Sequence, residues 1–226
     1  MKVLLFGATG MVGQGVLREC LLADDVELVE TVGRSASGGQ NPKLREVVHG
    51  DLWHYDAIAQ QLAGFDACFF CLGVTSSGMK EADYERVTYG MTLAAGEILS
   101  RLNPRMIFIY VSGAGTDSSE RGGSMWARVK GKTENALLRL PFVAYMFRPG
   151  IIQPLFGVKS KTRLYNVFYT IGKPLLPVLK LMFPNSVLTT QQVGLAMLEV
   201  ARHGYAKRVL ETKDIRVAAR IAQGQD

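Results

Sequence analysis

The chain opens with the stretch Lys2-Val3-Leu4-Leu5-Phe6-Gly7-Ala8-Thr9-Gly10-Met11-Val12-Gly13, and this stretch decides the fold. The apolar run 2–6 predicts a strand, and the apolar spacing over 11–22 predicts a helix directly after the glycines. A helix N-terminus presents unpaired backbone N–H groups, and glycines let a pyrophosphate approach them closely. The spacing is G-x-x-G-x-x-G, which meets the G-x-G-x-x-G fingerprint only in part, but the flanking strand and helix are the context that the motif requires.

We therefore expect this loop to bind a dinucleotide. The residues expected to contact the ligand are Gly7, Thr9, Gly10, Met11, Val12 and Gly13. The alternative is a glycine-rich turn between a strand and a helix that contacts no ligand.

Strands and helices alternate along the rest of the first 150 residues. Further strands are expected at 26–32, 44–49, 67–72, 106–111 and 142–147, and helices at 56–62, 80–102 and 126–140. Such alternation requires right-handed crossovers and a parallel sheet that is covered on both faces. The predicted fold class is therefore α/β, a doubly wound parallel Rossmann sheet.

The pattern changes after Arg148-Pro149-Gly150. Beyond that point we expect a small C-terminal lobe, then a helix at 191–203, a strand at 207–211 and a last helix. No linker divides the chain. We interpret 1–226 as a single NAD(P)-binding domain, with 151–190 as a lid or interface lobe.

The composition is that of a folded globular protein with a basic balance. Of 226 residues, 48% are hydrophobic and 20% are charged, and the formal net charge is +6. No Asp or Glu occurs from Ile151 to Leu198, so much of the excess charge lies there. A basic balance raises the question of nucleic acid, but no reading helix and no basic and aromatic strand patch is recognised. Nucleic acid is therefore not an expected partner.

The segment 164–184 is strongly apolar, but lysines and prolines interrupt it. A bilayer span needs about 20 consecutive apolar residues, so a transmembrane helix is not expected here. Three uses remain open. The segment could be a lid with an apolar lining, a peripheral contact with an anionic membrane surface, or a subunit interface in a homo-oligomer.

The cysteines are interpreted as core residues. Cys68 and Cys71 have C-x-x-C spacing, but they lie in a predicted buried strand, where residues three apart point to opposite faces. With Cys20 the number is odd, and the first apolar run is too short for a signal peptide, so reduced thiols and a cytoplasmic location are expected. Two histidines, at positions 49 and 54, flank an aspartate, but three ligands without a further one nearby do not predict a metal site.

The end of the second predicted strand bears on the choice of nucleotide. NAD-selective sites place an acidic residue there, whereas a nearby Arg accommodates the 2′-phosphate of NADP. Here the strand ends at Gly33-Arg34-Ser35, and Glu30 lies earlier in the run. Arg34, with Ser35 or Ser37, therefore favours NADP(H) over NAD(H). The alternative for Arg34 is a solvated surface cation.

Further short motifs follow the opening stretch in a specific order. They are Gly33-Arg34, Gly50-Asp51-Leu52, Leu72-Gly73 and Arg148-Pro149-Gly150. Together they resemble the atypical short-chain dehydrogenase/reductase family, and within it the NmrA-like or epimerase-like members and the Tat-interacting oxidoreductase subgroup. The resemblance implies positions by the adenine for Asp51 and Leu52, along the cofactor for Gly73, in the active site for Ser112, and beside the nicotinamide for Pro149 and Gly150. Without it, Asp51 starts a turn and Pro149-Gly150 ends a strand.

The catalytic pair that the resemblance implies is incomplete. The family uses Tyr-x-x-x-Lys on the helix after the fifth strand, because residues i and i+4 share a helix face and the Lys lowers the pKa of the phenol. This chain has Trp126 in place of the tyrosine, with Lys130 in place. An indole N–H can donate a hydrogen bond but cannot transfer a proton as a phenol does. The family's Asn in the preceding helix is also replaced, by Thr88.

Lys130 and Ser112 remain as candidate catalytic residues, and Lys130 can also bind the nicotinamide ribose. Three other proton sources stay open. Ser112 or Ser124 could relay a proton through water, Tyr84 or Tyr89 could reach in from the preceding helix, or substrate and solvent could supply the proton.

Two functions fit these observations. The first is an NADP-dependent oxidoreductase acting on an apolar small molecule, carbonyl-bearing or quinone-like. The second is a non-catalytic NADP(H)-binding or redox-sensing module that contacts a protein or membrane surface through 156–184.

Overall fold

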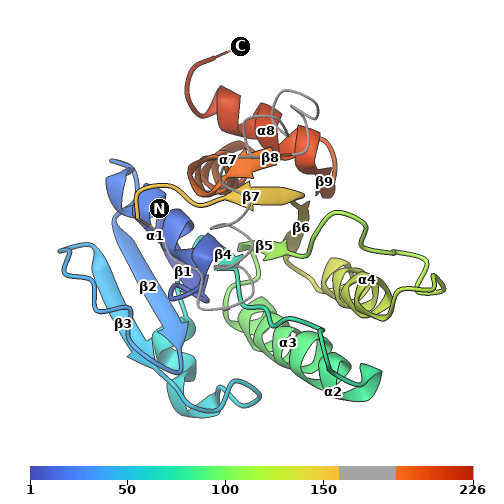
Figure 1. Ribbon diagram of the computed structural model, residues 1–226. Helices are drawn as coiled ribbons and strands as arrows, with labels where there is room; N and C mark the ends of the chain where they lie inside the picture. The colour runs from blue at the N-terminus through green and yellow to red at the C-terminus, as the bar shows by residue number, and fades with distance from the viewer. Residues whose placement is uncertain (158–186, 226) are drawn as a thin grey trace.

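The computed structural model describes residues 1–157 and 187–225. Its centre is a seven-stranded parallel sheet in the order β3-β2-β1-β4-β5-β6-β9 (Figure 1). The strands are β1 (Lys2–Phe6), β2 (Leu28–Gly33), β3 (Leu44–Val48), β4 (Ala67–Phe70), β5 (Ile107–Val111), β6 (Val143–Arg148) and β9 (Val209–Glu211). The strand order reverses between β1 and β4, which is the switch point of a doubly wound fold. The predicted fold class is confirmed.

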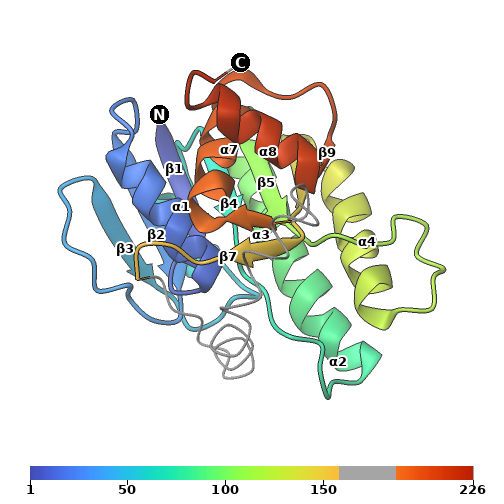
Figure 2. The ribbon, with the colours of Figure 1, turned by 45° about the horizontal axis from the view of Figure 1, so that its top comes forward.

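Helices cover both faces of the sheet (Figure 2). One face carries α1 (Met11–Leu22), α7 (Thr190–His203) and α8 (Thr212–Ile221), which pack against one another. The other face carries the 3-10 helix η1 (Asp56–Leu62), α3 (Met91–Leu102) and α4 (Met125–Leu138). Ahead of α3 come the short helix α2 (Glu81–Glu85) and the π-helical turn η2 (Arg86–Gly90). These two elements and α3 together form the helix predicted at 80–102.

The core consists of two apolar layers, one on each side of the sheet. Along β1, Val3 and Leu5 belong to the layer under α1 and α7, whereas Leu4 and Phe6 belong to the layer under α3. Both faces of the strand are therefore buried. This burial explains why the strand is a continuous apolar run rather than an alternating one.

The largest differences from the predicted elements lie in the C-terminal third. The strands β7 (Ile151–Gln153) and β8 (Val187–Thr189) pair in parallel as a separate two-stranded sheet, which the sequence did not predict. Three residues are too few to show a strand pattern. Helix α7 begins at Thr190 because Thr189 and Gln192 form a reciprocal capping box, with hydrogen bonds of 3.1 and 2.9 Å.

The predicted lobe 151–190 is therefore described only at its two ends. Residues 158–186 lie outside the described residues, and they include the basic, apolar segment considered as a lid, a membrane contact or an interface. Within the two described ranges, no helix has both the length and the apolar character needed to cross a membrane.

Cys20 and Cys68 are buried core residues, as predicted, whereas Cys71 is half-buried and lies just after the end of β4. Cys68 packs in the layer under α3, and Cys71 packs against the layer on the opposite side of the sheet. Burial raises the pKa of the Cys71 thiol to about 12 and that of Cys68 well above its ordinary value. Both are therefore protonated at neutral pH, and a thiol, unlike a thiolate, is a poor nucleophile.

Candidate functional site

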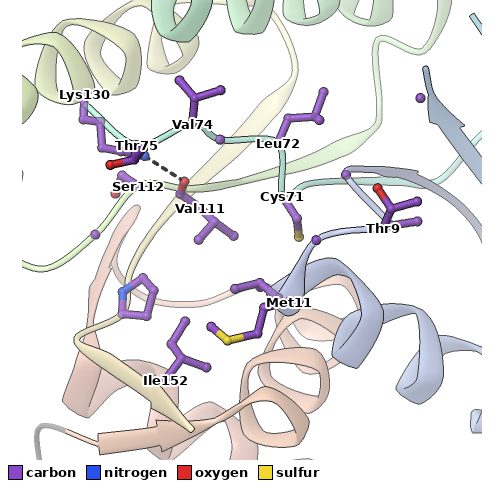
Figure 3. A pocket seen from close by; sticks show the side chains of 18 of the residues that line it. Thr9, Met11, Cys71, Leu72, Val74, Thr75, Val111, Ser112, Lys130 and Ile152 are labelled. Atoms are coloured by element: carbon purple, nitrogen blue, oxygen red, sulfur yellow. Dashed lines mark hydrogen bonds between the residues drawn. The ribbon is translucent and has the colours of Figure 1, made fainter. Parts of the chain in front are cut away.

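A cavity of about 730 Å³ opens at the carboxyl ends of β1, β4 and β5, across the switch point (Figure 3). Ligands of doubly wound folds bind at this place. Most of the residues expected to bind the cofactor or to act in catalysis line it, together with Trp126: Gly7, Thr9, Gly10, Met11, Val12, Arg34, Leu52, Gly73, Ser112, Trp126, Lys130, Pro149 and Gly150. Among the residues expected to bind the cofactor, Gly13 and Asp51 do not line it.

The glycine loop is held in shape by close contacts. Gly7 has a φ of +83°, and an added Cβ there would lie 2.8 Å from the backbone of Cys71. An added Cβ at Gly13 would lie only 2.0 Å from the carbonyl oxygen of Gly7. Gly13 thus lets the helix pack closely on the loop, and it is not among the residues that line the cavity. Both positions require glycine for the geometry of the loop itself.

The start of α1 has neither a side-chain cap nor an acidic residue. Gly10 is the N-cap residue, so no side chain caps the helix, and no acidic residue lies in its first turn. The first N–H groups of a helix have no intrahelical partner, and the helix dipole favours negative charge there. Because Met11 and Val12 line the cavity, their N–H donors lie at its wall, whereas the Gly10 N–H donates to the carbonyl oxygen of Gly7 at 2.9 Å.

The cavity continues into a smaller apolar slot of about 170 Å³. Leu52, Trp53, Val74 and Met91 are among the side chains that line it. The slot is apolar and lies beside Arg34 and Gly73. An added Cβ at Gly73 would meet no protein atom within 4 Å, so this backbone borders open space. Trp53 was not singled out from the sequence, since nothing in its spacing distinguishes it from a surface aromatic residue.

Asp51 lies outside both cavities. Its carboxylate accepts a hydrogen bond of 2.9 Å from the backbone N–H of Trp53 and pairs with Nδ1 of His54 at 2.7 Å. The hydrogen bond to His54 lowers the pKa of Asp51 and raises that of His54. The side chain thus closes a turn, and its neighbour Leu52 reaches the slot. Across the described ranges, no group of three potential metal ligands occurs.

Arg34 is exposed at the mouth of both cavities. Within residues 1–157 and 187–225, its guanidinium has no ion-pair partner. Ser35 also lines the larger cavity, whereas Ser37 donates its backbone N–H to Glu46 at 2.5 Å. Glu30 is buried inside β2 away from the cavity, and burial raises the pKa of its carboxyl. The end of β2 therefore offers a cation and no carboxylate.

Trp126 and Lys130 lie on one face of α4, one turn apart. The indole of Trp126 covers Gly113 and Gly115, where added Cβ atoms would lie 3.8 and 3.6 Å from its ring. The Nζ of Lys130 lies 3.5 Å from the carbonyl oxygen of Val111 and 5.3 Å from the ring of Tyr110 (Figure 3). Burial lowers the pKa of this ammonium to about 8, while a carboxylate one turn further, Glu134, acts in the opposite direction.

Glu134 is a site residue that the sequence reasoning missed. It is fully buried, and its carboxylate accepts a hydrogen bond of 2.5 Å from the Ser112 hydroxyl. Arg148 pairs with it through two donors, Nε at 3.0 Å and Nη2. Glu134 lies eight residues after Trp126 and four after Lys130. This spacing puts all three side chains on one helix face, and it could have predicted Glu134 as a site residue.

The alternative proton sources differ in where they lie. Tyr84 lines the cavity and is buried, which raises the pKa of its phenol. Tyr89 does not line it, and the ammonium of Lys132 lies 4.8 Å from its ring. Thr88 lines the smaller slot, and Ser124 is the N-cap of α4 outside both cavities.

No family model matches the chain. Two curated relatives are fungal proteins. The mitochondrial protein FMP52-2 of Scheffersomyces stipitis is 27% identical over 171 residues, covering 74% of this chain and 72% of that protein. The mitochondrial protein FMP52 of Meyerozyma guilliermondii is 24% identical over 155 residues, covering 67% and 65%.

These relatives contradict the cytoplasmic location expected from the sequence, because both are named as mitochondrial proteins. The expectation rested on reduced cysteines and a short first apolar run. Even where thiols are reduced, they do not separate the cytosol from other reducing compartments.

Solved structures share the fold over nearly the whole chain. The enzyme WbmF of Bordetella bronchiseptica in complex with NAD+ has a TM-score of 0.68 at 16% identity, covering 100% of this chain and 79% of that one. A short-chain dehydrogenase/reductase family oxidoreductase from Burkholderia thailandensis has a TM-score of 0.65 at 17% identity, covering 100% and 98%. The chain therefore has the Rossmann fold of short-chain dehydrogenase/reductase-type oxidoreductases, some crystallised with a nicotinamide dinucleotide.

Proposed function

We propose that the protein is an NADP(H)-dependent oxidoreductase of the atypical short-chain dehydrogenase/reductase type, close to the NmrA-like and Tat-interacting members, acting on an apolar small molecule. The observation that carries the proposal is the 730 Å³ cavity, which combines a helix start without a side-chain cap, Lys130, and an Arg34 that has no ion-pair partner among the described residues. The free helix N–H donors and the open space beside Gly73 fit a dinucleotide.

Each part of the cavity has a role in this proposal. The start of α1 binds the pyrophosphate, and Arg34 binds the 2′-phosphate. Leu52 and Trp53 enclose the adenine in the smaller slot, with Asp51 shaping the turn that positions them. Lys130 binds the ribose next to the nicotinamide, with Pro149 on the other side. When bound, the cofactor supplies or accepts hydride.

Proton transfer is where this chain departs from the family. Trp126 orients the substrate through its ring and its indole N–H, and it exchanges no proton. Lys130 has a pKa of about 8, so at neutral pH it carries a proton that it can release near the operating pH. We assign it the proton transfer as well as ribose binding, with the buried Tyr84 as the second proton source at the cavity.

Nucleotide titration tests the proposal. Calorimetric titration of the native chain should show NADPH binding more tightly than NADH, and Arg34→Asp should abolish that preference. Arg105→Asp is the matched control, because Arg105 is exposed, lies before β5 at the opposite end of the sheet and makes the same change in charge. Absence of binding of either nucleotide would refute the proposal.

One observation favours a second candidate, a non-catalytic module that binds NADP(H) and contacts a partner through 156–184. Trp126 occupies the place of the tyrosine, and an indole has no accessible pKa. A panel of carbonyl compounds and quinones distinguishes the two. An enzyme should oxidise NADPH with some member and lose that activity in Lys130→Ala, whereas a module should bind NADPH without turnover. If the native chain shows no turnover and Trp126→Tyr does, the non-catalytic module is favoured.

A further inference from the structure

The Ser112 hydroxyl lies between the cavity and a buried ion pair. Ser112 lines the cavity beside Lys130 (Figure 3). On its other side, its Oγ donates to Oε1 of Glu134 at 2.5 Å. Glu134 is 0% exposed and Arg148 is 11% exposed, so water does not compete for this pair. The surroundings of Ser112 are therefore fixed by protein groups.

Glu134 is ionised in this arrangement. Arg148 donates two hydrogen bonds to its carboxylate, and a guanidinium stays protonated at any ordinary pH. An ionised carboxylate only accepts hydrogen bonds. The hydrogen between Ser112 and Glu134 therefore belongs to the serine.

The second acceptor near Ser112 does not change this assignment. The carbonyl oxygen of Phe147 lies 3.1 Å from the Ser112 Oγ, but it already accepts the Ser112 backbone N–H at 2.9 Å. A hydroxyl has one hydrogen, and a charged acceptor at a shorter distance binds it more strongly. Within the described residues, no protein group donates to the Ser112 oxygen. Its lone pairs are left for a ligand.

We propose that the Ser112 hydroxyl only accepts hydrogen bonds from ligands in the cavity. Glu134 is the positioning residue, because its carboxylate binds the hydrogen of that hydroxyl. The cavity then favours a ligand whose hydroxyl lies against Ser112 over the corresponding ketone. The inference rests on the proposed function, because it takes the cavity to be the substrate site. It deepens that function by naming apolar alcohols as the substrate class.

The preference has a simple physical basis. A ligand hydroxyl donates its hydrogen to Ser112. A ketone has no hydrogen to donate, so the Ser112 oxygen stays unpaired even where the ketone oxygen accepts from Trp126 or Lys130. An unpaired buried polar group weakens binding by about 10-fold or more. The two forms of one carbon skeleton differ little in shape, so apolar contacts with Met11, Trp126 and Ile152 contribute almost equally to both.

The test compares 1-tetralol with 1-tetralone as probes, by calorimetry, on the full chain with ADP-ribose 2′-phosphate in excess so that no hydride transfer occurs. We expect the alcohol to bind about 10-fold more tightly. In Glu134→Leu/Arg148→Met, the Ser112 hydroxyl is free to turn, so the ketone should gain affinity and the ratio approach one. In Ser112→Ala, the alcohol should instead lose affinity to the level of the ketone.

Glu211→Gln is the matched control, because Glu211 also pairs with Arg148, at 3.2 Å, but does not contact Ser112. It should keep the ratio of the native chain. Equal or tighter binding of the ketone to the native chain, binding of neither probe, or an unchanged ratio in Ser112→Ala would overturn the inference. Ser112→Ala leaves the ion pair intact, so the test does not depend on the double variant folding. If the nucleotide fails to bind while the alcohol preference persists, only the proposed function fails.

Discussion

The buried pair of Glu134 and Arg148 makes a quantitative prediction about stability. In Arg148→Met, Glu134 stays in a fully buried site, and among the described residues only the Ser112 hydroxyl still donates a hydrogen bond to it. Removing one member of a buried ion pair costs about 3–5 kcal/mol, because the other charge is left without compensation. For a chain of this size, that loss corresponds to a fall in Tm of roughly 6–20 °C.

The double variant Glu134→Leu/Arg148→Met should recover most of this loss. It replaces both charges by apolar side chains of similar volume, and such replacements are often close to neutral. The pair therefore couples strongly in a double-mutant cycle, and the cycle separates the cost of a stranded charge from the cost of lost packing.

Urea unfolding followed by circular dichroism measures all four corners of the cycle. The control is Arg202→Met, which breaks the ion pair of Arg202 with Asp25. The side chain of Arg202 is 25% exposed and that of Asp25 is 50% exposed. An exposed pair of this kind contributes about 0–1 kcal/mol. A cost below about 1 kcal/mol for Arg148→Met, or a double variant as unstable as the sum of the two single ones, would refute the reasoning.

Two further predictions concern the cavity. Gly13→Ala places a Cβ 2.0 Å from the carbonyl oxygen of Gly7, so the loop must shift and NADPH affinity should fall at least about 10-fold in a fluorescence titration. Gly123→Ala, where a Cβ meets no atom within 4 Å and which lines neither cavity, should leave it unchanged. Burial lowers the pKa of Lys130 from its ordinary 10.5 to about 8, so folding disfavours its protonated form. Lys130→Met should therefore raise the free energy of unfolding, with the whole gain present below pH 8 and the gain fading as the pH rises from about 8 to 10.5. Urea unfolding across this pH range measures the gain, and a gain that grows with pH would contradict the lowered pKa of Lys130.

The fold was predictable because its signals are local. Strand β1 and helix α1 follow from an apolar run, three glycines and a helical spacing that all lie within the first 22 residues. The buried strands β4, β5 and β6 are apolar because helices cover both faces of the sheet, and such runs are visible without knowing what covers them. The small β7-β8 sheet was missed, because its two strands are three residues each and 33 residues apart.

The candidate site was predictable only where one motif carries the chemistry. The glycine loop, Arg34 and the Trp126 and Lys130 positions come from short continuous stretches, and the structure brings them to one cavity. Trp53 lies in a turn with no distinguishing spacing and was not predicted, whereas Tyr84 was named only as one of several open proton sources. Their place at the cavities depends on how η1 and α2 pack on the sheet.

The sequence by itself determined the strands of the sheet, the glycine-rich start of α1 and the spacing of Trp126 and Lys130, because each depends on residues that are adjacent along the chain or one helical turn apart. Only the tertiary structure decided the role of Ser112. Its partners are Glu134, 22 residues later on α4, and through it Arg148 at the end of β6. Parallel strands bring these distant residues to one edge of the sheet, and the direction of a hydroxyl's hydrogen depends on which acceptors surround it after folding.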